Sequence, residues 1–119
     1  MPHIKLEHTK KINNKEIQFL FEKLIKIIIK HADVKENNCK CKAIHIPIYS
    51  IGNKNQAGFF HIEISLLIGR SEKIKKNIGK DTLEILKSIF NLYNSNNDIQ
   101  FSMEIKELKP NHYFTTNNI

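Results

Sequence analysis

The sequence predicts an α+β fold in which two βαβ units form a four-stranded mixed sheet with two helices on one face. Four stretches alternate apolar and polar residues with the period of a strand, and two longer stretches repeat apolar residues with the period of a helix. Their order is strand, helix, strand, and then the same again. The chain has 119 residues, 40% of them hydrophobic, which suits the core of one domain.

The first βαβ unit is expected over residues 2–51. Alternation over 3–8 predicts a strand, and apolar residues at helical spacing predict a helix over 14–32. Residues 33–42 are polar and typical of a loop. Isoleucines alternate with polar residues over 44–48, which predicts a second strand whose isoleucines face the core.

The second unit is expected over residues 58–108. The pattern predicts a long strand over 60–68, a helix from 72 to about 93, and a final strand over 99–105. The tail over 109–119 has no strong periodicity, and we expect it to dock onto a neighbouring subunit. The apolar face of this second helix is expected to hold Ile74, Ile78, Leu83, Leu86, Ile89 and Phe90.

Local signals mark several boundaries of these elements. Asn13, with Glu16 three residues later, resembles a capping box, and Ser71 is a good helix N-cap. Residues 52–58 are rich in Gly and Asn and are typical of a turn. Pro47 cannot donate to a strand ladder, so it indicates an edge strand or a bulge.

The predicted topology leaves one face of the sheet uncovered. Within each unit a crossover helix connects the strands, so they should be parallel. The uncovered face should be mixed in character and available for oligomerisation or for ligand binding. It should carry His61, Glu63, Ser65, Gln100, Ser102 and Glu104.

Charge and cysteine usage narrow the functional classes. The net charge of +7 favours an acidic partner, which could be a polyanionic small molecule, nucleic acid or a membrane surface. No apolar stretch is long enough for a membrane span, and the N-terminus lacks a signal-peptide pattern, so we expect a cytoplasmic protein. Cys39 and Cys41 are too close in sequence for an ordinary disulfide and are expected to be free thiols.

Pro2 is the first candidate catalytic residue. Removal of Met1 would expose its secondary amine, and an apolar or cationic environment would lower the amine pKa towards neutrality. Such an amine can act as a general base. If Met1 remains, the proline nitrogen is an amide and cannot be the base. Many Met-Pro openings have no catalytic role, so this feature needs support from the rest of the chain.

Arg70 is the first candidate for substrate binding. Lys and Arg total 19 residues, and Arg70 is the one arginine among them. A guanidinium binds a carboxylate through two parallel hydrogen bonds, which an ammonium cannot do. The alternative is an arginine without function at a helix N-terminus. His45 and His61 lie on the predicted polar side of their strands, but their spacing does not match a metal motif, and we expect no metal.

Four motifs follow one another along almost the whole chain and together resemble a known family. They are Met1-Pro2-His3, Phe59-Phe60-His61-Ile62 leading into Ile68-Gly69-Arg70-Ser71, Met103-Glu104-Ile105-Lys106-Glu107-Leu108-Lys109-Pro110, and Phe114-Thr115-Thr116-Asn117-Asn118. In order and spacing they are similar to the 5-carboxymethyl-2-hydroxymuconate delta-isomerases of the tautomerase superfamily. The Gly-Arg-Ser step also resembles the strand-to-helix junction of the smaller 4-oxalocrotonate tautomerases.

The resemblance implies one tautomerase-like domain over residues 1–119 that assembles as a homotrimer and takes part in the catabolism of aromatic compounds. It implies that Pro2 moves a proton within a 2-hydroxymuconate-type unsaturated dicarboxylic or tricarboxylic acid, without a metal or an organic cofactor. Arg70 matches the family's arginine. The family's second basic position is an Arg-x-Arg pattern, and its nearest match here is Lys40 and Lys42, which keep the charge but lose the bidentate fork.

Two alternatives stay open at this point. The order βαββαβ also suits a ferredoxin-like RNA-binding module, and the basic charge agrees with it. Against that reading, the third strand lacks the basic-Gly-aromatic pattern, and Phe60 falls on the apolar side. The other alternative is a tautomerase that has lost catalysis and acts as a binding protein, which the lysines at 40 and 42 suggest.

Overall fold

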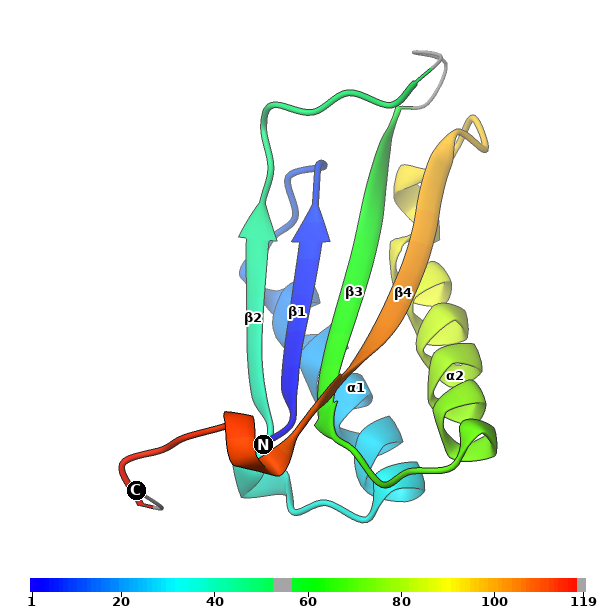
Figure 1. Cartoon of the computed structure of the whole chain (residues 1–119). Coiled ribbons are helices and arrows are strands. Elements are labelled where there is room, and N and C mark those ends of the chain that lie inside the picture. The colour runs from blue at the N-terminus through cyan, green and yellow to red at the C-terminus, as the bar shows by residue number, and fades with distance from the viewer. Residues whose placement is uncertain (53–56, 118–119) are drawn as a thin grey trace.

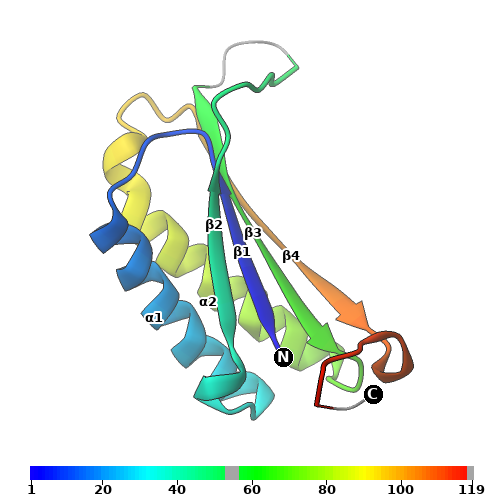
Figure 2. The same cartoon turned by 90° about the vertical axis from the view of Figure 1, so that its left-hand side faces the viewer.

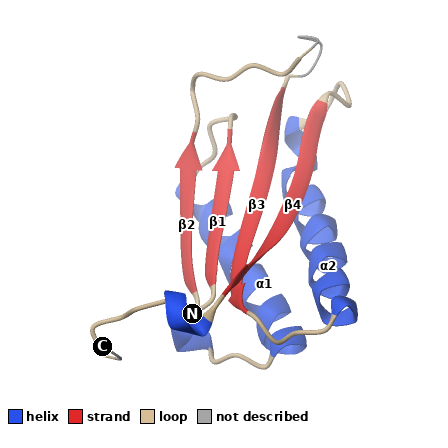
Figure 3. Cartoon of the chain, in the orientation of Figure 1, coloured by secondary structure: helices blue, strands red, loops and turns tan. Residues whose placement is uncertain are grey.

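A computed structural model of the chain describes residues 1–52 and 57–117. The predicted order of strands and helices is confirmed (Figure 3). Most of the turn predicted over 52–58 and the last two residues of the tail lie outside the described residues. The elements are β1 (His3–His8), α1 (Asn14–Ala32), η1 (Glu36–Asn38), β2 (Lys40–His45), β3 (Gly58–Leu67), α2 (Glu72–Phe90), η2 (Asn91–Tyr93), β4 (Ile99–Leu108) and η3 (Pro110–His112).

The four strands form one mixed sheet in the order β2-β1-β3-β4. The outer pairs β1–β2 and β3–β4 are parallel, and the central pair β1–β3 is antiparallel. Figures 1 and 2 show both helices on the same face of this sheet. The fold class read from the sequence is therefore confirmed. Because β1 and β3 run in opposite directions, β1 begins at the end of the sheet where β3 and β4 finish.

The core lies between the sheet and the helices. Alternate residues of β1 and β3 point to it, because successive side chains of a strand face opposite sides. Phe60 is fully buried, and its ring stacks on Phe90 with centroids 4.6 Å apart and on Phe101 at 5.5 Å. Other core residues with no more than 1% of their surface exposed are Ile4, Leu6, Leu20, Leu24, Ile28, Ile62, Ile64, Leu66, Ile78 and Leu86.

The predicted helix starts are confirmed by their caps. The Asn13 side chain accepts a hydrogen bond from the Glu16 N–H at 2.9 Å and donates to the Glu16 carboxylate at 3.0 Å. The Ser71 hydroxyl accepts from the Ile74 N–H at 3.2 Å, which satisfies one of the unpaired N–H groups of the first turn. Asp33 ends α1 in the left-handed conformation, with φ of 53°.

The predictions for the second strand were wrong in position and in facing. β2 begins at Lys40, inside the stretch expected to be a loop, and ends at His45. Cys41 and Ala43 pack against the core, so Ile44 faces the opposite side and is 43% exposed. His45, expected on the polar side, instead stacks on His8. The alternation of isoleucines predicted the wrong facing, because the small side chains of Cys41 and Ala43 are enough to cover the core at this edge strand.

The core face of α2 also differs from the prediction. Thr82 is fully buried, whereas Leu83 is 38% exposed, because 78, 82, 86 and 90 follow the four-residue spacing of the buried stripe. Among the described residues, the Thr82 hydroxyl is a buried side-chain oxygen without a hydrogen-bond partner. The helix ends at Phe90, and the expected last turn is the separate 3-10 helix η2.

The face of the sheet opposite the helices is mixed, as the sequence predicts, and it carries several charged side chains. One oxygen of Glu63 lies 3.5 Å from the Lys5 ammonium and 3.3 Å from the Lys106 ammonium. The His61 ring lies 3.0 Å from a Glu104 oxygen. We call this side, which carries residues 3, 5 and 7 of β1 and their cross-strand neighbours, the open face. In the described part of the chain, neither long helix is apolar enough to cross a membrane.

Candidate active site

Pro2 lies directly before β1 and is buried. Its carbonyl accepts a hydrogen bond from the Lys40 N–H at 3.0 Å, which ties the beginning of β1 to the beginning of β2. Proline fixes φ, so the direction in which the chain enters the strand is restricted at this residue. The first catalytic candidate is therefore held in one place at the end of the sheet.

The electrostatic surroundings of the chain start favour a neutral amine. Met1 precedes Pro2, and burial lowers the pKa of the Met1 amine from its usual 8.0. The positive charge of Lys40 lowers this pKa further, and the nearby Cys39 thiol opposes the shift. An ammonium loses hydration on burial and is repelled by a cation, so both main causes favour loss of the proton. An amine in this environment suits a proton acceptor near neutral pH.

Lys40 and Lys42 lie next to this terminus on the open face. In the sheet register His3 pairs with Lys40, and Lys5 pairs with Lys42. Both lysines are exposed. They were predicted in a loop, and β2 instead presents them two residues apart on one side of a strand. Together with Lys5, they make the proline end of the open face positively charged.

Arg70 lies at the same end of the sheet, in the connection between β3 and α2. Its guanidinium donates to the Leu67 carbonyl and to the Ala32 carbonyl, each at 3.0 Å. Ala32 is the last residue of α1, so the guanidinium binds one of the carbonyls that a helix leaves unpaired at its C-terminus. These bonds use two of the five N–H donors of the group. Arg70 thus lies on the helix side of the sheet, away from the open-face lysines.

The structure brings the sequence candidates to one end of the sheet, but not into one cluster. Pro2 and Lys40 are joined by a backbone hydrogen bond, and Lys42 follows on the same face. Arg70 approaches from the other side and bonds to backbone carbonyls. A small hollow of about 50 Å³ lies on the β1–β2 edge beside Pro2. It is lined by His3, Ile4, Lys40, Cys41 and Lys42.

Two residues of this region were not singled out from the sequence. The His3 ring lies 2.9 Å from the Tyr113 hydroxyl, across 110 positions of the chain. His3 is part of the Met-Pro-His motif, so its position was visible in the sequence. Tyr113 is in a tail without periodicity, and no local signal indicated that it would return to the first strand.

The environment of the two cysteines next to Lys40 favours the protonated thiol. Both are free. Burial, and to a lesser extent Cys39, raises the pKa of the Cys41 thiol to about 11, and burial also raises the pKa of Cys39. The thiolate is the nucleophilic form, so neither side chain is suited to attack a substrate at neutral pH.

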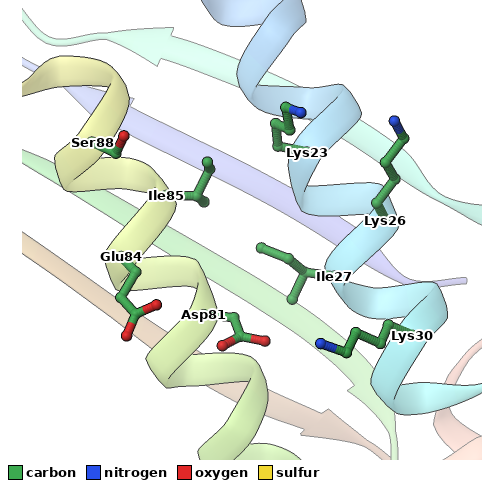
Figure 4. Close-up of a pocket in the computed structure, with 8 residues that line it drawn as sticks. All are labelled: Lys23, Lys26, Ile27, Lys30, Asp81, Glu84, Ile85 and Ser88. Atoms are coloured by element: carbon green, nitrogen blue, oxygen red, sulfur yellow. The ribbon is translucent and has the colours of Figure 1, made fainter.

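A larger groove of about 420 Å³ lies elsewhere, between the outer sides of α1 and α2 (Figure 4). Figure 4 shows lysines on the α1 side and carboxylates on the α2 side. It contains none of the candidate catalytic or substrate-binding residues. Its lining residues are Lys23, Lys26, Ile27, Lys30, Asp81, Glu84, Ile85 and Ser88.

Solved structures with low sequence identity share this fold. A 5-carboxymethyl-2-hydroxymuconate isomerase from Deinococcus radiodurans R1 matches with a TM-score of 0.83 and 24% identity, covering 98% of this chain and 90% of that chain. A wild-type symmetric trimer of fused 4-OT matches with a TM-score of 0.82 and 13% identity, covering 98% and 95%. A macrophage migration inhibitory factor-like protein from Entamoeba histolytica matches with a TM-score of 0.74 and 13% identity, covering 96% of this chain and 94% of that chain.

The four-stranded mixed sheet with two helices on one face is thus the tautomerase-like fold that these structures share. A model of the family described as 5-carboxymethyl-2-hydroxymuconate isomerase matches residues 2–119. The chain belongs to this family, and it is an isomerase. The resemblance read from its sequence motifs is confirmed. None of the curated protein sequences matches this chain.

Proposed function

We propose that the protein catalyses a cofactor-free 1,3-proton shift in a 2-hydroxymuconate-type unsaturated dicarboxylic or tricarboxylic acid, with Pro2 as the proton carrier. The observation that carries this proposal is the position of the chain start, where burial and Lys40 lower the pKa of an amine at one end of a tautomerase-fold sheet. Membership of the isomerase family gives that amine a chemical role. The proposal requires that Met1 is removed, so that the amine belongs to Pro2.

In the proposed reaction, one amine carries out both proton transfers. The neutral Pro2 nitrogen accepts the proton of the 2-hydroxyl group, and the electron pair of that O–H bond moves into the conjugated system. The resulting dienolate is stabilised by neighbouring cations. The Pro2 ammonium then donates the same proton to carbon 3, the other carbon of the enol double bond, which gives the keto isomer and restores the neutral amine. Proton and charge balance over the cycle, and no metal or organic cofactor takes part.

Recognition of the acid is assigned to the cations at this end of the sheet. Lys40 and Lys42 are exposed on the open face and can attract carboxylates as point charges. Arg70 has N–H donors beyond the two that bond to Ala32 and Leu67, and these can bind a second carboxylate. Because Arg70 and the lysines approach from opposite sides of the sheet, an acid with two or more carboxylates suits the site better than a monoacid.

We also propose that the protein is a homotrimer. The fused 4-OT structures that share its fold are trimers. The open face provides an uncovered sheet surface that an assembly can use. Analytical ultracentrifugation tests this proposal, with a mass of three chains of 13.9 kDa expected. A monomer at micromolar concentration would contradict it.

Mass spectrometry and one substitution test the base. The native protein is expected to lack the mass of Met1, and Pro2→Ala is expected to lower isomerase turnover of 2-hydroxymuconate-type acids by about 100-fold or more. Folding of the variant is checked by circular dichroism and by its sedimentation. A chain that keeps Met1, or a Pro2→Ala variant with normal turnover, would show that Pro2 is not the base.

Arg70→Lys tests the bidentate contact while keeping the charge. We expect kcat/KM to fall by roughly 10- to 100-fold, because a hydrogen bond to a charged group contributes about 1.5–3 kcal/mol. Arg70 also binds the end of α1, so the melting temperature of the variant must be measured beside its kinetics. Equal kcat/KM in both proteins would remove Arg70 from the substrate site.

Two other functions are outcomes of the same experiments. Absence of ketonisation of a simple enol such as phenylenolpyruvate, in a folded trimer, would favour a tautomerase that has lost catalysis. A salt-sensitive shift with single-stranded RNA, together with no turnover, would favour the RNA-binding alternative. Phe60, the aromatic residue considered for that alternative, is fully buried between Phe90 and Phe101 and cannot stack on a base.

A further inference from the structure

The C-terminal segment returns to the end of the sheet where β1 begins. β4 ends there at Leu108, η3 turns the chain, and Tyr113 follows. Figure 1 shows η3 at the same end of the sheet as the N-terminus. The Tyr113 hydroxyl lies 2.9 Å from His3 Nε2, and the two rings meet edge to face with centroids 5.7 Å apart. The last part of the described chain therefore contacts the residue that follows Pro2.

His3 belongs to the candidate site by position and by charge. It is bonded to Pro2, pairs with Lys40 in the sheet, and lines the small hollow with Lys40 and Lys42. Burial lowers the pKa of His3 below its usual 6.5, and Lys40, the terminal amine and Lys42 lower it further. The imidazole is therefore neutral at neutral pH. A neutral Nε2 can accept the hydrogen bond of the Tyr113 phenol.

The end of a chain needs such a restraint if its terminal residue performs chemistry. Backbone at a chain terminus is poorly ordered unless other groups hold it. The Lys40 N–H holds the Pro2 carbonyl, and the Tyr113 hydroxyl holds the side chain of the next residue. A base must point at the reacting atom to within a fraction of an ångström for efficient proton transfer. The two contacts act on the same short segment from different sides.

We propose that Tyr113 is a positioning residue that, through its hydrogen bond to His3, fixes the direction of the terminal amine of the Pro2 site. This inference rests on the proposed function of Pro2. It gives the C-terminal segment a role within its own chain. From the sequence alone, this segment was expected to dock onto a neighbouring subunit. Tyr113 itself need not touch the substrate.

The first test is the removal of one hydroxyl group at two places. Tyr113→Phe keeps the ring and loses the bond to His3. Tyr49→Phe is the matched control, because the Tyr49 hydroxyl donates to the Ala57 carbonyl at 2.8 Å, near the other end of the sheet. We expect Tyr113→Phe to lower kcat by about tenfold with KM changed by less than about twofold, and Tyr49→Phe to leave both unchanged.

A purely structural hydrogen bond would give a different pattern. It would lower the melting temperature of both variants to a similar extent and leave kcat of both at the level of the native protein. Unchanged kcat in Tyr113→Phe overturns the inference. So does an equal fall of kcat in Tyr49→Phe, because it would show that any lost hydroxyl weakens the enzyme.

A double-mutant cycle tests whether Tyr113 acts through His3. The double variant His3→Ala/Tyr113→Phe should be no slower than His3→Ala alone, because the hydroxyl has lost its partner. His3→Gln offers an amide to the phenol and should recover part of kcat relative to His3→Ala. Losses that multiply in the double variant would show that the two residues act independently, and would overturn the inference.

A nitrogen NMR titration of the terminal amine separates this inference from the proposed function. Lys40, Cys39 and the neutral His3 lie near that amine, and Lys42 acts on His3. Its pKa should lie below the ordinary value of about 8 in the native protein and closer to that value in Tyr113→Phe, since a mobile terminus is better solvated. Should the native protein lack turnover, the proposed function fails. A difference in amine pKa between the native protein and Tyr113→Phe would then still support the positioning role of Tyr113. Equal pKa values in the two proteins would reject it.

Discussion

The two βαβ units of this protein share an architecture and differ in their charges. Both helices have 19 residues, and the strands within each unit are parallel. On the open face the first unit carries Lys5, Lys40 and Lys42 against Glu7, whereas the second carries Glu63 and Glu104 against Lys106. Buried residues of both helices follow a four-residue spacing, at 20, 24, 28 and 32 in α1 and at 78, 82, 86 and 90 in α2. The comparison shows that one backbone architecture can carry a net positive charge on one half of the open face and a net negative charge on the other half.

The helices differ at one core position as well. Counted from the first residue of each helix, Leu24 in α1 corresponds to Thr82 in α2, and both are fully buried. Leucine fills its place with apolar surface. Threonine buries a hydroxyl that has no hydrogen-bond partner among the described residues. The buried stripe of α1 is therefore apolar at this position, whereas the buried stripe of α2 contains a polar oxygen.

The largest expected effect comes from making the first helix like the second. Leu24→Thr should lower the free energy of unfolding by about 3 kcal/mol, because it removes buried apolar volume and adds an unpaired hydroxyl. Urea unfolding followed by circular dichroism measures this change. The same substitution at the exposed Leu83 is the control and should cost less than about 1 kcal/mol. Equal costs at the two positions would show that the comparison of the helices has no energetic meaning.

The charge difference between the units is tested at Lys40. Lys40→Met should raise KM for a dicarboxylic enol by about tenfold, because it removes a cation beside Pro2 and keeps much of the aliphatic chain. Lys87→Met, on the exposed side of α2, removes the same charge from the second unit and should leave KM unchanged. Steady-state kinetics at low and high salt measure both. A similar rise of KM in the two variants would mean that net charge alone attracts the substrate.

A smaller effect of opposite sign is expected when the second helix is made apolar. Thr82→Val keeps the shape of the side chain and removes the unpaired hydroxyl, so the free energy of unfolding should rise by about 1 kcal/mol. Chemical unfolding of the native protein and the variant measures the difference. Ser88→Ala, an exposed hydroxyl on the same helix, is the control. A loss of stability in Thr82→Val would indicate that the hydroxyl has a partner in solution.

The smallest effects concern the pH dependence of stability, and the two units should lose stability in different pH ranges. Burial lowers the pKa of His3 and His8 in β1 below 6.5, so their contribution to stability is present above this value and is lost as pH falls through the folded pKa values. The hydrogen bond from His61 lowers the pKa of Glu104 in β4 below 4.5, and its contribution is lost below that value. The first unit should therefore weaken at a higher pH than the second.

Unfolding free energies measured between about pH 7 and about pH 3 test this order. His8→Asn keeps a donor near the Nδ1 position, which bonds to the Lys10 carbonyl at 2.7 Å, and should flatten the dependence in the upper part of the range. Glu104→Gln should flatten the lower part. The prediction fails if His8→Asn leaves the upper slope as steep as in the native protein.

Several parts of the fold could be predicted because their causes are local. The Asn13 and Ser71 caps require side chains three residues from their partners, and both are present in the structure. The alternation of β1 and β3 fixes which residues enter the core. In contrast, β2 was placed too late, because its core contacts come from Cys41 and Ala43, which have little apolar surface of their own. Their facing depends on pairing with β1, which is not local information.

The candidate site divides in the same way. Pro2, Arg70 and the lysines of β2 were identified as residue types suited to acid recognition and proton transfer. Their arrangement was not predictable, since the guanidinium binds the Ala32 carbonyl and lies on the helix side. The contact of Tyr113 with His3 was equally hidden. It depends on where β4 ends relative to the start of β1, and a strand order is needed to know that.

By itself the sequence determined the order of the elements, the helix caps, the buried alternation of the central strands and the family, because each depends on residue type and short-range spacing. The tertiary structure decided the facing of β2, the burial of Thr82, the side from which Arg70 approaches and the return of Tyr113 to the first strand. The physical reason is that these features depend on contacts between segments far apart in the chain. Their register is fixed when the sheet pairs and the helices pack on it.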